Sequence, residues 1–118
     1  MKQEAKAMKL YIDKTEVPVT WEDSSSVADL QAHLPLTIQM SRYGGNEQVG
    51  SIGRNIVRAD KETTTHYGDI VLYSGNKIVI FYGSNSWAYT RLGHVNLSQQ
   101  EMTDLLSRSD VRITIAEE

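Results

Sequence analysis

The sequence predicts a mainly β fold: a closed antiparallel barrel of seven or eight short strands, capped by two helices. Over most of the chain, apolar residues alternate with polar ones, which is the two-residue period of a half-buried strand. Two segments combine helical spacing with helix-start signals, and they do not alternate with single strands as βαβ units would. Closing the sheet into a barrel removes exposed sheet edges.

Length and composition indicate one globular domain. The chain has 118 residues, a mass of 13.3 kDa, a formal net charge of -3 and no cysteine. A chain of this size can bury enough surface to form a core of its own. The lack of cysteine excludes disulfides, thiol nucleophiles and Cys-ligated zinc. The mildly acidic balance argues against a nucleic-acid partner.

The start of the chain differs in character from the rest. We expect residues 1–7 to be a disordered leader or tag remnant, and residues 8–118 to form the single domain. Residues 1–7 are charged and lack the apolar stretch of a signal peptide. A cytoplasmic location is the default expectation, and export would require an upstream signal that has been removed. No stretch approaches the ~20 apolar residues that span a bilayer.

The first half of the chain predicts a hairpin and a further strand. Residues 8–12 and 17–21 are β-prone and flank a loop of about four residues, 13–16. Residues 36–41 alternate between apolar and polar side chains and predict a half-buried strand. Residues 47–65 are mostly polar and predict a long loop over the barrel surface. One irregular strand is expected within that loop, around Ile52, Ile56 and Val57.

Two helices are predicted from capping signals. Ser26, with Asp29 three residues further on, supplies acceptors for the free N–H groups of a helix over 26–33. Ser98 and Glu101 form a capping box at the start of the second helix. The expected buried faces consist of Val27, Leu30 and Leu34 in the first helix, and Met102, Leu105 and Leu106 in the second. We expect the second helix to have a purely structural role, closing one side or end of the barrel.

The second half of the chain predicts four strands. Residues 69–74 and 77–82 form a hairpin joined by Gly75-Asn76. Both faces of this hairpin are apolar, so both must be covered, and a helix packed outside the barrel would cover the outer one. Residues 88–95 and 111–115 predict the remaining two strands.

Five short motifs are similar, in order and spacing, to those of the bacterial cyclophilin-like family of small barrels. They are LPLT (34–37), YGGNE (43–47), GDIVLY (68–73), IFYG (80–83) and WAYTRLGHV (87–95). The resemblance covers residues 8–116. It implies a cyclophilin-like, closed eight-stranded antiparallel β-barrel capped by two helices. It implies no settled biochemical activity.

True cyclophilins are peptidyl-prolyl isomerases, and their chemistry has to be tested against this sequence. A guanidinium polarises the proline amide while an apolar pocket holds the ring. The isomerase signature resembles Phe-His-Arg-Ile followed by Phe-x-x-Gln-Gly-Gly-Asp, and this sequence contains neither motif. Arg42 and Arg54 are the weak catalytic candidates. A divergent prolyl isomerase is therefore the alternative function.

A stripe of side chains near residue 90 is the first candidate binding surface. Trp87, Tyr89 and Arg91 share one face of a strand. Two aromatic rings and a cation can stack on a ligand, with the arginine binding a carboxylate or carbonyl. The alternative is that the two rings pack in the barrel core or against a helix.

The segment before Gly44-Gly45 is the second candidate. Arg42 has the strand parity of Met40 and points toward the barrel mouth, where an inward arginine needs a carboxylate. Glu47 could supply one, so a structural Arg42–Glu47 pair is the alternative to a ligand site. The candidate ligand-binding residues are Met40, Arg42, Tyr43, Glu47, Tyr82, Trp87, Tyr89 and Arg91.

No motif predicts a metal or a cofactor. His33, His66 and His94 are isolated in the sequence, without the spacing of metal ligands. We expect Asp69 to turn or cap the backbone at the start of its strand. The favoured function is a non-catalytic binding domain for an extended peptide or a small molecule. We expect a monomer or weak dimer with no nucleic-acid partner.

Overall fold

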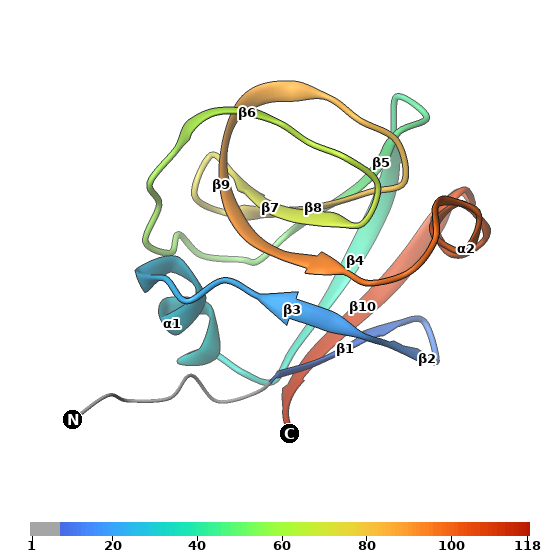
Figure 1. Ribbon diagram of the computed structural model, residues 1–118. Coiled ribbons are helices and arrows are strands. Elements are labelled where there is room, and N and C mark those ends of the chain that lie inside the picture. Colours follow the sequence, from blue (N-terminus) through green and yellow to red (C-terminus); the bar gives the residue numbers. More distant parts are fainter. Residues whose placement is uncertain (1–7) are drawn as a thin grey trace.

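The computed structural model describes residues 8–118, which form ten strands and two α-helices (Figure 1). In chain order these are β1 (Met8–Ile12), β2 (Thr15–Val17), β3 (Val19–Trp21), α1 (Ser25–Gln31), β4 (Leu36–Tyr43), β5 (Glu47–Ser51), β6 (Lys61–Thr64), β7 (Asp69–Tyr73), β8 (Lys77–Phe81), β9 (Ser86–Val95), α2 (Gln99–Leu106) and β10 (Asp110–Glu117). The expected leader or tag remnant, residues 1–7, lies outside the described residues.

The strands form a nearly closed antiparallel barrel, which confirms the predicted fold class. Their order is β2-β1-β10-β4-β5-β8-β7-β9-β3, and β6 pairs with β9 off this path. At the seam, the Nε1–H of Trp21 in β3 donates to the carbonyl oxygen of Met8 in β1, at 3.1 Å. This side-chain hydrogen bond links β3, at one end of the sheet, to β1, the second strand from the other end.

The ten strands exceed the expected eight because three segments pair differently from the prediction. Thr15 and Glu16 pair with β1, which shortens the predicted four-residue loop to a two-residue turn. Pro18, which has no N–H for a ladder, separates β2 from β3. The predicted loop 47–65 contains β5 and β6, and the expected irregular strand within it is absent. The turn between β7 and β8 spans residues 74–76, one more than predicted.

Strand β5 escaped prediction because its core-facing positions are not apolar. The Gln48 side chain is buried, and its Nε2 donates to the carbonyl oxygens of Leu106 and Arg108 at 2.8 and 2.9 Å. At Gly50 an added Cβ would lie 2.5 Å from the Met40 sulfur, so no side chain fits there. An amide and a glycine thus occupy positions where alternation analysis looks for aliphatic residues.

The hairpin of β7 and β8 is apolar on both faces, as predicted. Ile70, Leu72, Ile78 and Ile80 point into the main core of the barrel. On the outer face, a second and smaller cluster consists of Val71, Val79, Phe81 and Tyr89. This face is covered in part by Tyr89 of β9, not by the helix that we expected.

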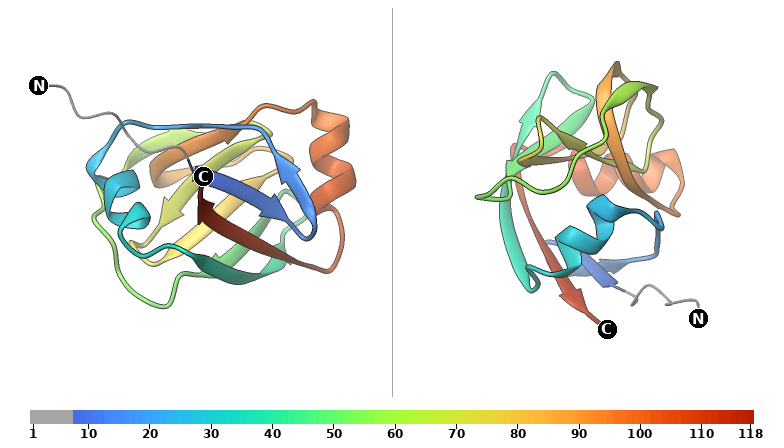
Figure 2. Two further views of the ribbon diagram at one scale, coloured as in Figure 1. Left: turned by 90° about the horizontal axis from the view of Figure 1, so that it is seen from below. Right: turned by 90° about the vertical axis from the view of Figure 1, so that its left-hand side faces the viewer.

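The two helices lie at opposite ends of the barrel (Figure 2). Val27 and Leu30 of α1, and Met102 and Leu106 of α2, are buried in the main core. The cap of α1 is Ser24, whose Oγ accepts from the N–H of Val27, and the predicted cap at Ser26 was wrong. The structure confirms the capping box at the start of α2.

We predict that truncation at two neighbouring leucines of α2 will have very different costs. Leu106 is fully buried, whereas Leu105 is only partly buried. Leu106→Ala should lower the free energy of unfolding by about 2–5 kcal/mol through the cavity that it leaves. Leu105→Ala, the matched control, should cost clearly less. Urea unfolding measures both values, and equal costs would contradict this account of how α2 packs.

Candidate functional site

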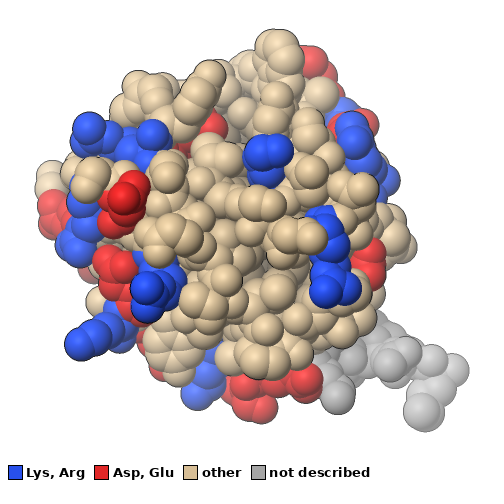
Figure 3. Space-filling model, turned by 180° about the vertical axis from the view of Figure 1, so that it is seen from behind, with Lys and Arg blue, Asp and Glu red and all other residues tan. Residues whose placement is uncertain are grey.

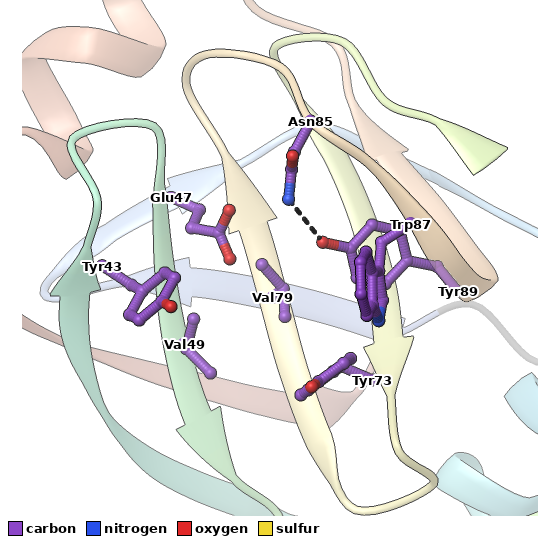
Figure 4. A pocket seen from close by; sticks show the side chains of 8 residues that line it. All are labelled: Tyr43, Glu47, Val49, Tyr73, Val79, Asn85, Trp87 and Tyr89. Atoms are coloured by element: carbon purple, nitrogen blue, oxygen red, sulfur yellow. Dashed lines mark hydrogen bonds between the residues drawn. The ribbon is translucent and has the colours of Figure 1, made fainter. Parts of the chain in front are cut away.

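A pocket of about 550 Å³ opens on the outer face of the sheet, above the second apolar cluster (Figure 4). We call it the outer-face pocket. Its lining residues come from β4, β5, β7, β8, β9 and the loop before β9: Tyr43, Glu47, Val49, Tyr73, Val79, Asn85, Trp87 and Tyr89. Two valines form an apolar floor, and four aromatic side chains surround it (Figure 4).

The turn between β4 and β5 positions one side of the pocket. Gly44 and Gly45 have φ of 68° and 93°, the left-handed region that favours glycine. The carbonyl oxygen of Asn46 accepts from the N–H groups of Tyr82 and Gly83, at 3.0 and 2.9 Å. These bonds fix the turn to the end of β8. The strand register then places Glu47, the first residue of β5, between Tyr43 of β4 and Phe81 of β8.

Strand β9 and the loop before it form the opposite side. The backbone of Asn85 exchanges hydrogen bonds with buried Thr65, which holds the loop in place. The Asn85 side chain donates to the Tyr89 hydroxyl at 3.0 Å. The Tyr89 ring makes edge contacts with Tyr73 and Phe81, at centroid distances of 6.1 and 5.8 Å. Such contacts fix the ring between its neighbours.

Glu47 is the one acidic residue among the lining side chains. It is 6% exposed, and no hydrogen bond or ion pair holds its carboxylate among residues 8–118. Burial raises the pKa of the Glu47 carboxyl above its usual range. Burial also raises the pKa of the Tyr89 hydroxyl, and the negative charge of Glu47 adds to that rise. The pocket thus places one acidic group against aromatic rings.

Four of the predicted binding residues meet in this pocket. They are Tyr43, Glu47, Trp87 and Tyr89. The other four lie elsewhere: Met40 and Tyr82 are buried in the main core, Arg42 is exposed on β4, and Arg91 binds Asp69. Sequence analysis missed Val49, Tyr73, Val79 and Asn85. The alternation of the central hairpin could have placed Tyr73 and Val79 on one face.

The expected Arg42–Glu47 pair is wrong, since no ion pair joins the two side chains within the described part of the chain. Strand register explains why. Arg42 pairs with Gln48 and Tyr43 pairs with Glu47, so Arg42 and Glu47 lie on opposite faces of the sheet.

Asp69 holds a polar cluster next to the site. As predicted, it caps the backbone, accepting from the His66 N–H at 2.9 Å. Its carboxylate also binds Arg91 at 3.0 Å and His94 at 2.8 Å. Burial alone would raise the pKa of Asp69, but these three interactions together lower it. Arg91 is therefore a structural partner of Asp69 and does not line the pocket.

The two isomerase candidates are also outside the pocket. Arg54 contacts the Nδ1 atom of His33 at 3.0 Å, and neither Arg54 nor Arg42 is among the lining residues. Among residues 8–118, no three His, Cys, Asp or Glu side chains gather in a way that could hold a metal ion. Over the same residues, no helix is long and apolar enough to cross a membrane.

Charged side chains on the back of the molecule do not form a single-sign patch. Basic and acidic groups are interspersed around the edge of this face, and its centre is mostly uncharged (Figure 3). This view shows no continuous basic stripe of the kind that follows a nucleic-acid backbone.

Comparison with known sequences agrees with the barrel and its motifs. The sequence profile of the cyclophilin-like family matches residues 10–116, nearly the whole chain. The chain therefore belongs to the cyclophilin-like family. A search of curated proteins found no match.

We predict that Asp69→Asn will destabilise the fold at neutral pH, by about 1–3 kcal/mol, because it removes hydrogen bonds to a charged acceptor. The lowered pKa of Asp69 stabilises the folded state above the unfolded-state pKa. This stabilisation is lost as the pH falls through the lower folded-state pKa. Urea unfolding at several pH values should therefore show the variant converging on wild type in acid. Asp23→Asn, at an exposed position, is the control. A pH-independent loss would contradict the argument.

We predict that Glu47→Gln will stabilise the protein at neutral pH, by about 0.5–2 kcal/mol, because it removes a buried carboxylate that has no partner among residues 8–118. The pKa of Glu47 is raised by folding, so ionisation destabilises the folded state increasingly as the pH rises through that pKa. The gain should vanish in acid, where the carboxyl is neutral in both states.

The control for this variant is Glu62→Gln, an exposed position on β6. It should change the free energy of unfolding by no more than about 0.5 kcal/mol. A loss of stability in Glu47→Gln at neutral pH would mean that the carboxylate has a stabilising partner, contrary to this description.

Proposed function

We propose that this cyclophilin-like domain is a non-catalytic binding module, whose ligand is an extended peptide or a small molecule held in the outer-face pocket. The observation that carries the proposal is the composition of the lining: an apolar floor, aromatic walls and a few polar groups. Ligand sites usually combine an apolar surface with a small number of polar groups that orient the ligand. The volume of about 550 Å³ lies within their usual range.

The position of the pocket supports the proposal. It lies on the outer face of the sheet, whose inner face contributes to the main core. Its walls come from paired strands, and hydrogen bonds to Asn46 and Thr65 fix the two turns beside it. A binding site on rigid elements loses little conformational entropy when a ligand binds.

The alternative of a divergent prolyl isomerase lacks a supporting observation. It requires a guanidinium beside an apolar pocket that fits a proline ring. Neither candidate arginine belongs to the lining, and the acidic Glu47 lies in the pocket instead. A carboxylate repels the developing negative charge that an electrophilic arginine would stabilise.

We predict that a ligand found by thermal-shift screening will require Trp87. This side chain is 56% exposed and lines the pocket, so Trp87→Ala should lower affinity about tenfold or more. The stability of the unliganded variant should change little, since the ring is largely in solvent. Calorimetric titration measures the affinity of each variant.

Tyr67→Ala is the control, because Tyr67 is 39% exposed but does not line the pocket. It should bind the ligand as wild type does. Equal affinity of Trp87→Ala and wild type for the ligand would show that the binding site lies elsewhere.

A further inference from the structure

The outer-face pocket contains a carboxylate that has no counter-charge among residues 8–118. Glu47 is more than nine-tenths buried, faces the pocket, and has no hydrogen-bond or ion-pair partner within residues 8–118. None of the eight lining residues is basic. Buried carboxylates are normally paired, because leaving water without a partner is costly. A cation bound in the pocket would supply the counter-charge that these residues do not provide.

The surroundings of Glu47 indicate the chemistry of that partner. Tyr43 lies on one side of the pocket, Trp87 and Tyr89 lie on the other, and the Glu47 carboxylate points into the space between them (Figure 4). Aromatic faces carry negative quadrupolar potential and attract ammonium and guanidinium groups. A carboxylate and several rings around one space thus favour the same type of guest, a cation.

The floor of the pocket adds a second requirement. Val49 and Val79 are apolar and lie beneath the rings. A small hydrated metal ion would gain nothing from them, whereas an alkyl chain would bury apolar surface there. A single carboxylate is also a poor site for calcium or magnesium, which bind through several oxygen ligands.

We infer that the outer-face pocket selects an organic cation, an ammonium group on an alkyl chain, with Glu47 as its counter-charge and the surrounding rings as its walls. This inference rests on the proposed binding function and names its ligand class. Such a group is found on the lysine side chain of a peptide and on small free amines. Both sources share the chemistry that the pocket recognises.

The test compares cations with neutral molecules of the same shape. n-Butylammonium and 1-butanol form the free pair, and N-acetyl-lysine methylamide and N-acetyl-6-hydroxynorleucine methylamide form the peptide pair. Binding is followed by NMR shifts of pocket amides at about pH 8, well above the ordinary pKa of a glutamate. Wild-type protein should bind the cation of at least one pair about tenfold tighter than its neutral counterpart.

Two sets of variants assign this preference to the pocket. Glu47→Gln should bring the ratio of the two affinities close to one, while Glu62→Gln, at an exposed position, should keep it. Trp87→Phe retains an aromatic face and should keep most of the cation affinity, whereas Trp87→Leu should lose it. Tighter binding of the lysine probe than of butylammonium would identify a peptide as the source, and the reverse order would identify a free amine.

Two outcomes would overturn the inference, and they separate it from the proposed function. If wild type binds neutral and cationic probes equally at the pocket, or if Glu47→Gln keeps the preference, the ligand class is wrong while the binding site stands. If no probe shifts pocket amides and no ligand from the screen depends on Trp87, the binding function itself fails.

Discussion

The structure depends on a central hairpin, β7 and β8, that is apolar on both faces. Together with β9 it presents aliphatic residues to the barrel core, and it also presents Val71, Val79 and Phe81 outward. If the outer face stayed exposed to water, the free energy gained by burying its apolar side chains would be lost. The chain covers it by folding the first half of β9, paired with β6, away from the barrel and over the sheet. The pocket occurs where that cover stops, between Tyr89 and the turn of β4 and β5.

A buried carboxylate and an apolar floor are in energetic conflict, and this pocket holds both, with no partner for the carboxylate in the described part of the chain. Glu47 lies on the same strand face as Val49, two residues away. Gln48, between them, points the other way and binds the carbonyl oxygens at the end of α2. Alternation along one short strand therefore sends one polar group to stabilise the barrel and another to a place where it costs stability. Polar groups that cost stability are frequent at functional sites.

How far the sequence predicts this molecule depends on the type of local signal. Alternation at Val111, Ile113 and Ile115, and the capping box at Ser98, gave correct elements because pattern and burial agree there. Strand β5 was missed because Gln48 and Gly50 face the core, where close backbone packing and an amide replace aliphatic residues. The two-residue alternation of the strand correctly placed Trp87 and Tyr89 on one face. It could not show that Arg91, on the same strand, binds the carboxylate of Asp69, 22 residues earlier, and so does not line the pocket.

The chain has two tryptophans, and the fold gives them separate surroundings. Trp21 lies at the seam of the barrel, partly buried and hydrogen-bonded to the backbone of Met8. Trp87 is largely in solvent at the mouth of the pocket. Indole fluorescence responds to solvent contact, so the two emissions report on different events. In a Trp87→Phe protein the remaining emission follows the opening of the barrel, and in a Trp21→Phe protein it would respond to a ligand that enters the pocket. The molecule thus contains one optical probe for folding and another for the proposed binding.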